Sequence, residues 1–79
     1  MLSMWQEVDD RLVKEFTFID FKTALGFVNK IGDLAESLGH HPDIELSWGR
    51  VKVCLTSHEH GGVTAKDKQL AKQIDNLKS

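Results

Sequence analysis

Cysteine and proline are almost absent from this sequence, since Cys54 and Pro42 are the only examples among its 79 residues. A lone cysteine excludes a disulfide within the chain and a metal knuckle built from several thiolates. We expect Cys54 to be a small apolar residue that is buried or half-buried. No repeat or low-complexity stretch appears either, and the length is too short for two folded units. The sequence therefore predicts a single domain over residues 1–79.

Concentrated charge and long apolar runs are also missing. The net charge is -2 and no basic cluster is present, which argues against direct binding to nucleic acid. The segment 1–5 is followed at once by the mostly polar stretch 6–10, so we expect neither a signal peptide nor a membrane-spanning segment. A cytoplasmic location is the resulting expectation. A core this small leaves marginal stability, which favours association into a homo-oligomer.

The first third of the chain predicts a hairpin followed by a helix. Residues 5–8 and 12–18 flank Asp9-Asp10, and polarity alternates within 12–18, which is typical of two strands joined by a turn. Asp20 is a good helix N-cap and Gly39 a good residue to end a helix in the left-handed conformation. Between them apolar residues recur every three or four positions. We expect one helix over about residues 20–38.

The second half predicts another hairpin and a closing helix. Pro42 begins an extended segment in which Ile44, Leu46 and Trp48 share a face, Gly49 makes a turn, and residues 51–55 form the next strand. A loop over 56–63 leads to a helix that is capped at Thr64. The order is strand, strand, helix, strand, strand, helix. This order predicts an α+β fold with a four-stranded antiparallel sheet and two helices on one face.

Most residues capable of acid-base chemistry fall near the end of the first helix. Glu36 precedes His40 by one helical turn, so its carboxylate can orient that imidazole. Histidine exchanges protons near neutral pH, and His40-His41 at a rigid turn suits general acid-base catalysis. The alternatives are that Glu36 is a solvated acid, that one histidine caps the helix carbonyls and that the other faces solvent. Spacing alone leaves these alternatives open.

Four more residues each have a structural and a functional interpretation. Asp67 completes a capping box with Thr64, and Trp48 fits the core better than a platform for a flat ligand. His58 and His60 form a His-x-His pair that can ligate a metal, although they lie in a glycine-rich loop without a helical pair of ligands. We therefore expect no metal, and keep a metal-binding regulator as an alternative.

The joint pattern resembles the signature of the pterin-4a-carbinolamine dehydratases. It consists of Glu36, His40-His41-Pro42, Trp48, His58 and Asp67 at their present spacing. The stretches 14–18, 20–21 and 24–27 also look like the family's first long strand and the start of its helix. The stretches 51–58 and 61–64 look like its last strand and the start of its final helix. The resemblance covers about residues 12–77.

This resemblance implies a function and a set of site residues. The family dehydrates 4a-hydroxytetrahydropterins to quinonoid dihydropterins without a metal or organic cofactor, on an α+β fold that assembles into dimers or tetramers. It implies that the candidate catalytic residues are His40, His41 and His58, with Glu36 and Asp67 as supporting acids, and that His40, His41, Pro42, Trp48 and His58 bind the pterin. We expect His41 and His58 to carry protons and His40 to position the ring. A link to an aromatic amino-acid hydroxylase is also implied.

The sequence departs from the family pattern at two places. Ile44 stands where the family usually has an aromatic residue, which changes one wall of the expected pterin pocket. The usual helix before the first strand is expected to be missing. A non-enzymatic role in dimerisation, assembly or transcription on the same fold remains the main alternative, because some members of the family have such roles.

Overall fold

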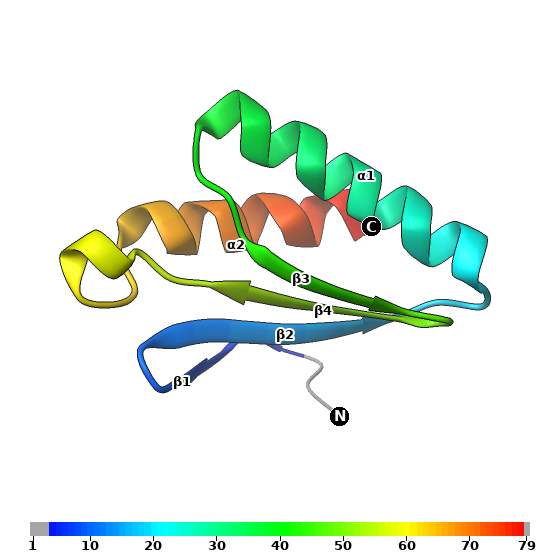
Figure 1. Cartoon of the computed structure of the whole chain (residues 1–79), viewed down its shortest axis with the longest axis horizontal. Coiled ribbons are helices and arrows are strands. Elements are labelled where there is room, and N and C mark those ends of the chain that lie inside the picture. Colours follow the sequence, from blue (N-terminus) through cyan, green and yellow to red (C-terminus); the bar gives the residue numbers. More distant parts are fainter. Residues whose placement is uncertain (1–3, 79) are drawn as a thin grey trace.

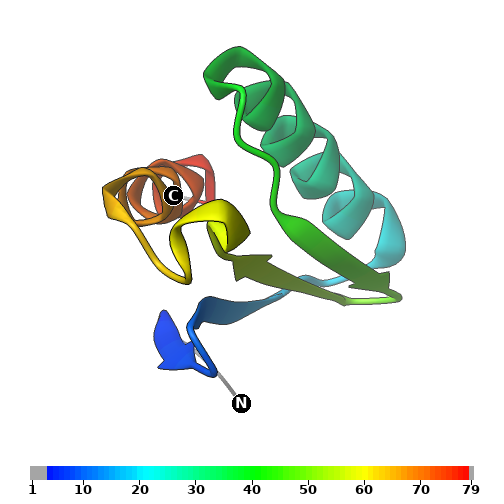
Figure 2. The ribbon, with the colours of Figure 1, turned by 60° about the vertical axis from the view of Figure 1, so that its left-hand side comes forward.

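The computed structural model describes residues 4–78, apart from the side chain of His58. Four strands form one antiparallel sheet, and two α-helices cover one of its faces (Figures 1 and 2). The elements are β1 (Gln6–Val8), β2 (Arg11–Thr17), α1 (Phe21–Leu38), β3 (Asp43–Ser47), β4 (Arg50–Leu55), the 3-10 turn η1 (His58–His60) and α2 (Ala65–Lys78). The predicted α+β class and order of elements are confirmed, and no helix precedes β1 among the described residues.

The sheet has the strand order β1-β2-β4-β3, so the two long strands lie in its centre. The register pairs Leu12 with Leu55 and Phe16 with Val51, which places their side chains on the face that the helices cover. The opposite face carries polar residues, including an ion pair of 2.9 Å between Arg50 Nη1 and Glu15 Oε2. The alternation that predicted the strands therefore reflects one buried and one open face.

One tight turn joins the two strands of each hairpin. Asp9 and Asp10 both have positive φ angles, 51° and 63°, a conformation that matches the twist of a two-residue hairpin and that aspartate tolerates. At the other hairpin the Phe18 amide donates to the Gly49 carbonyl over 2.8 Å. A Cβ atom on Gly49 would lie 2.8 Å from the Phe18 carbonyl oxygen, so this close approach requires glycine.

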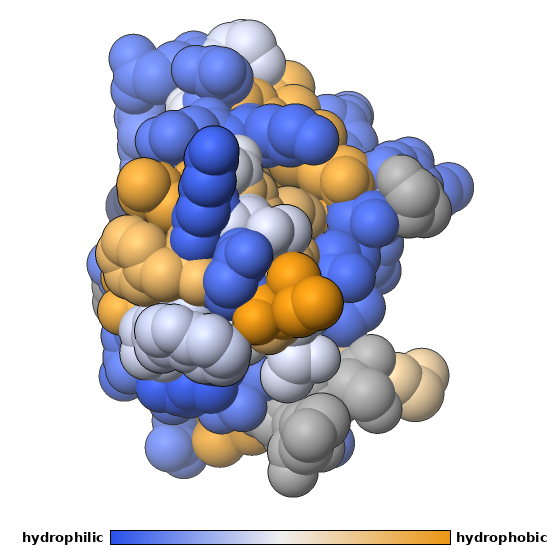
Figure 3. Space-filling model, turned by 90° about the vertical axis from the view of Figure 1, so that its right-hand side faces the viewer, coloured by the Kyte–Doolittle hydropathy of each residue, from blue (hydrophilic) through white to orange (hydrophobic). Residues whose placement is uncertain are grey.

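Trp48 lies in the turn between β3 and β4, and its expected place in the core is wrong. The residue is 68% exposed. Its strand ends at Ser47, so the alternation that buries part of Ile44 and Leu46 does not extend to Trp48. Ile19 and Phe21 are also exposed where α1 begins. Figure 3 faces this end of the molecule and shows apolar surface scattered among hydrophilic side chains.

Local signals in the sequence fix both ends of α1. The carboxylate of Asp20 accepts a 2.8 Å hydrogen bond from the Thr23 amide, and Gly39 ends the helix with a φ of 64°. The apolar stripe of the helix faces the sheet and contains Ala24, Phe27, Ile31 and Ala35. The predicted bounds are thus confirmed to within one residue.

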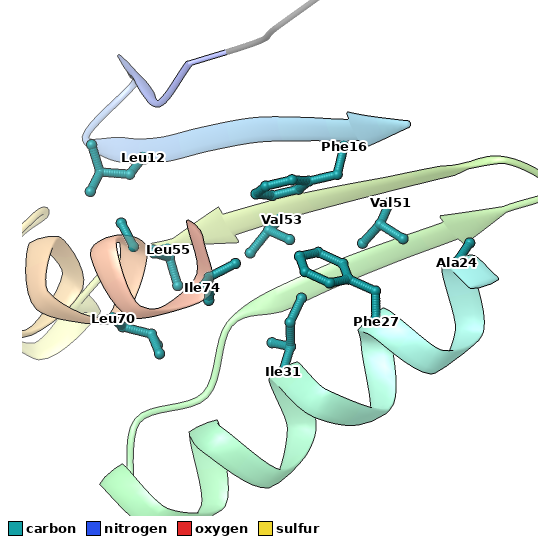
Figure 4. Packing of buried hydrophobic residues seen from close by; sticks show 11 residues of the cluster. Leu12, Phe16, Ala24, Phe27, Ile31, Val51, Val53, Leu55, Leu70 and Ile74 are labelled. Carbon is teal, nitrogen blue, oxygen red and sulfur yellow. The ribbon is translucent and has the colours of Figure 1, made fainter. Parts of the chain in front are cut away.

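The core lies between the sheet and the two helices (Figure 4). The rings of Phe16 and Phe27 pack with centroids 4.8 Å apart. Ile31 of α1 and Ile74 of α2 are fully buried in this core. Outside this cluster, Trp5 Nε1 donates to Asp75 Oδ1 over 3.0 Å and holds the first strand against α2. No helix in the described part of the chain has the length and apolar character needed to cross a bilayer.

Replacing Ile31 by alanine should cost about 2 to 5 kcal/mol in the free energy of unfolding, because it leaves a cavity in a fully buried site. Urea denaturation measures the change. Leu25→Ala is the matched control, since Leu25 lies on the same helix and is 39% exposed. A loss for Ile31→Ala no larger than that for Leu25→Ala would contradict the assigned core.

Candidate active site

The candidate site is built where α1 ends and α2 begins, at neighbouring ends of the two helices (Figure 1). The Gly39 amide donates to the carbonyls of Ala35 and Glu36, and the His40 amide donates to that of Ala35 over 3.2 Å. These bonds close the last helical turn. The left-handed glycine then directs the chain away from the helix axis, so that His40 and His41 leave α1 in different directions.

His40 forms a buried pair with Asp67. Its Nε2 atom lies 2.5 Å from Asp67 Oδ1, and the two side chains are 16% and 0% exposed. Because Nε2 bonds to the carboxylate, Nδ1 is the imidazole nitrogen that remains for a ligand. A carboxylate that holds one nitrogen also fixes the orientation of the ring. The pair therefore provides a rigid group for hydrogen bonding or proton exchange.

Asp67 itself is held by the loop and helix start around it. Its Oδ2 atom accepts a 2.8 Å hydrogen bond from the Ser57 hydroxyl, a 2.9 Å bond from the Thr64 amide and a longer one from the Thr64 hydroxyl. Burial alone would raise the pKa of Asp67, but the bonds from His40, Thr64 and Ser57 and the charge of His40 outweigh it and lower the pKa. The carboxyl group is therefore ionised at neutral pH.

His41 forms a second pair, which is exposed. Its Nε2 atom lies 2.5 Å from Glu36 Oε2, and the side chains are 60% and 77% exposed. Water screens such a pair, so its contribution to stability is about 0 to 1 kcal/mol. The imidazole of His41 is open to solvent and can exchange protons with it. Two carboxylate-supported imidazoles thus stand on consecutive residues in different environments.

The pairing of Glu36 with His40 that the helical spacing allows is not formed. Glu36 bonds to His41 instead, and His40 bonds to Asp67, because the chain no longer follows helical geometry beyond Gly39. The predicted capping bond from the Thr64 amide to Asp67 is confirmed. Ser57 was not predicted as part of the site, because its ten-residue separation from Asp67 matches no local motif.

The other predicted site residues lie at different places. Pro42 follows His41 directly and precedes β3, so it adjoins the site in the chain. Trp48 lies beyond the opposite end of β3, so the structure does not bring it to the histidine pairs within one chain. Ile44 is half-buried in β3 and packs against the core.

His58 and His60 belong to η1, between β4 and α2. The side chain of His58 lies outside the described residues, so its expected role stays a prediction. His60 lines a shallow hollow of about 330 Å³ together with Thr64, Ala65 and Lys66. Among the side chains described, no group of three or more histidine, cysteine or acidic residues is arranged to hold a metal ion.

Comparison with known proteins assigns the family. The profile of the family described as pterin 4 alpha carbinolamine dehydratase matches residues 1–77. The chain belongs to this family. A curated relative from Thermosynechococcus vestitus is 56% identical over 92% of this chain and 77% of its own. Another from Aquifex aeolicus is 49% identical over 96% of this chain and 77% of its own. Both carry the name pterin-4-alpha-carbinolamine dehydratase only provisionally.

Two solved structures have the same fold as this chain. A transcriptional coactivator/pterin dehydratase from Brucella melitensis superposes with a TM-score of 0.89 at 37% identity, over 96% of this chain and 83% of its own. A pterin dehydratase-like protein identified as a RuBisCO assembly factor of the alpha-carboxysome superposes with a TM-score of 0.76 over 94% of this chain and 86% of its own. At 24% identity, the second comparison supports the fold alone.

The buried carboxylate predicts a pH-dependent stability. Its lowered pKa stabilises the folded state above about pH 4, the ordinary pKa of aspartate, and this contribution is lost as the pH falls through the pKa of the folded protein. Asp67→Asn should reduce the free energy of unfolding at neutral pH by about 1 to 3 kcal/mol, because buried donors lose their partner.

Urea denaturation of the Asp67→Asn variant and the wild type as a function of pH measures this effect. The difference should shrink as the pH falls below about 4 and through the lowered pKa of the Asp67 carboxyl group in the folded protein. Asp33→Asn, at an exposed position of α1, is the control and should change stability little at any pH. A difference for Asp67→Asn that stayed constant down to acid pH would refute the role of the ionised carboxylate.

Proposed function

We propose that this protein is a pterin-4a-carbinolamine dehydratase, a lyase that converts 4a-hydroxytetrahydropterin to quinonoid dihydropterin and water. The observation that carries the proposal is the pair of carboxylate-supported imidazoles on His40 and His41, one buried and one exposed. Membership in the dehydratase family supports the same chemistry. The substrate would then be a small pterin.

The reaction needs two proton transfers and no redox step. The bond between C4a and the hydroxyl oxygen breaks, and the oxygen leaves as water after it gains a proton. The proton on N5 is removed, and its electron pair forms the new double bond to C4a. An imidazole exchanges protons at neutral pH in either direction, so histidines are suited to both transfers. The loss of water changes no oxidation state overall, so the proposal invokes no cofactor.

The environments of the histidines support different roles for them. Asp67 holds the ring of His40 in one orientation, which suits positioning of the pterin through Nδ1. His41 is exposed and exchanges its proton readily with solvent, which suits a proton carrier. We assign the second proton transfer to His58 on the basis of the family resemblance. Glu36 and Asp67 act as the supporting acids.

His41→Ala should lower kcat/KM for dehydration by about 100-fold or more, the contribution typical of a general acid or base. The absorbance change that follows formation of the quinonoid dihydropterin measures the rate. Glu36→Gln is the matched control, because it removes only the exposed carboxylate and should cost less than about tenfold. Wild-type protein that dehydrates the substrate no faster than buffer does would overturn the proposed function.

A binding role on the same fold is a second candidate function. The similar structure from Brucella melitensis is described as both a transcriptional coactivator and a pterin dehydratase. A binding role of this kind requires the surface of the fold but not the histidine pairs. A double variant, His41→Ala/His58→Ala, separates the two functions in cells from which the native protein has been deleted.

Under the dehydratase proposal, the double variant should fold normally, as judged by circular dichroism. It should nevertheless fail to correct the growth defect of cells from which the native protein has been deleted. Full restoration by a variant without dehydratase activity would favour the binding role.

We also propose that the chain acts as a homodimer or homotetramer. A chain of 79 residues buries a small core, and association adds buried surface. The strand β3 is an edge of the sheet, so its outer backbone groups have no partner strand among the described residues. Such an edge can pair with a second copy.

A further inference from the structure

A second cleft lies away from the histidine pairs, between the first half of α1 and the last turn of α2. It has a volume of about 360 Å³, within the range typical of small-molecule sites. Its lining residues are Phe18, Thr23, Gly26, Phe27, Lys30, Leu77 and Lys78. The cleft is therefore formed by two stretches that are distant in the sequence, residues 18–30 and 77–78.

Aromatic and aliphatic side chains form the apolar part of this cleft. The rings of Phe18 and Phe27 pack with centroids 5.1 Å apart, and Phe27 is only 4% exposed. Leu77 contributes from α2 and is half-buried. Packed aromatic rings favour contact with another flat ring. The floor of the cleft thus suits an aromatic group.

The polar part of the cleft is cationic. Lys30 and Lys78 line it, both are exposed, and no acidic residue does so. Lys78 Nζ lies 5.0 Å from the centroid of the Phe18 ring, above the apolar floor. None of the ion pairs found among residues 4–78 includes either lysine. Two ammonium groups with no carboxylate partner among the described residues favour a negatively charged ligand.

Gly26 leaves one wall of the cleft open. A Cβ atom at this position would meet no atom within 4 Å, so the space in front of the helix is not filled by packing. Glycine in the middle of a helix is less favourable than alanine. A Cβ atom at Gly32, which is also in α1, would likewise meet no atom within 4 Å, but Gly32 does not line the cleft. The two glycines therefore provide a matched pair for a test.

The cleft is separate from the histidine pairs. Gly26 lies twelve residues before Leu38 on α1, which corresponds to about 18 Å along the helix axis. Leu77 and Asp67 likewise lie near opposite ends of α2. A small molecule in the cleft would therefore not touch His40 or His41.

We propose that this cleft binds a small aromatic carboxylate as a second ligand. The ring packs against Phe18, Phe27 and Leu77, and the carboxylate accepts hydrogen bonds from the ammonium groups of Lys30 and Lys78. An apolar body with one negative charge matches both parts of the cleft, whereas a neutral aromatic molecule matches only the floor.

Titration of the isotope-labelled full chain with indole-3-acetate, followed by amide chemical shifts, tests the proposal. Saturable shifts are expected at Thr23, Gly26 and Lys30, with no comparable shift at His40. Indole-3-acetamide, which has the same shape without the charge, should bind at least fivefold more weakly. The double variant Lys30→Gln/Lys78→Gln should reduce the affinity for the acid to that for the amide.

The two glycines give the matched variants. Gly26→Leu fills the cleft and should abolish the saturable shifts, whereas Gly32→Leu adds the same side chain elsewhere on α1 and should preserve them. Thermal unfolding confirms that each variant is folded, and Gly26→Met, with Gly32→Met as its control, replaces Gly26→Leu if the branched side chain is not tolerated.

Any one of four results would overturn the proposal. The first is no saturable shift with the acid, and the second is equal binding of the acid and the amide. The third is unchanged binding in the folded Gly26 variant. Chemical shifts at the cleft that depend on protein concentration but not on the ligand would also overturn it, because they would assign the cleft to contact between copies of the chain.

Discussion

The buried carboxylate of Asp67 is the interaction on which the arrangement of the site depends. It is fully buried in the first turn of α2, yet both of its oxygens have hydrogen-bond partners. One oxygen binds His40 beyond the end of α1, and the other binds Ser57 and Thr64 around the loop that precedes α2. A buried charge is tolerated only when it is paired and hydrogen-bonded. The need to satisfy this carboxylate therefore connects two helix ends and a loop at one place.

The two histidine pairs differ in the property that matters for their chemistry, which is access to solvent. The pair of His40 and Asp67 is held in a low-dielectric environment, where each hydrogen bond is stronger and the geometry is fixed. The pair of His41 and Glu36 is exposed to water, which weakens the attraction between the two groups. The fold thus places a buried imidazole next to an exposed one, although the two residues are adjacent in the chain.

The helix layer has two distinct ends. At one end, the end of α1 meets the start of α2 through the bond between His40 and Asp67. At the other end, the first half of α1 and the last turn of α2 leave a cleft lined by aromatic rings and lysines. The exposed Trp48 lies beyond the end of β3 that is opposite the histidine pairs. The fold therefore has chemically different surfaces at its two ends.

The sequence by itself determined the elements of this protein, because the signals that define them are local. Asp20 and Gly39 mark the ends of α1, the alternation of residues 51–55 marks β4, and Thr64 with Asp67 marks the start of α2. The family pattern also singled out Glu36, His40, His41 and Asp67, which are the members of the two histidine-carboxylate pairs. The sequence did not predict which of those groups bond to one another, because their hydrogen-bond partners depend on the direction in which the chain leaves each element.

Only the tertiary structure decided that Asp67 supports His40 and that Glu36 supports His41. The left-handed turn at Gly39 ends the helical spacing that would have allowed Glu36 to reach His40. The same holds for Ser57, whose contact with Asp67 exists because the η1 loop folds back against α2, and for Trp48, whose strand ends one residue before it. Periodicity along the chain predicts which face a residue occupies within an element, but it contains no information on contacts made beyond the end of that element.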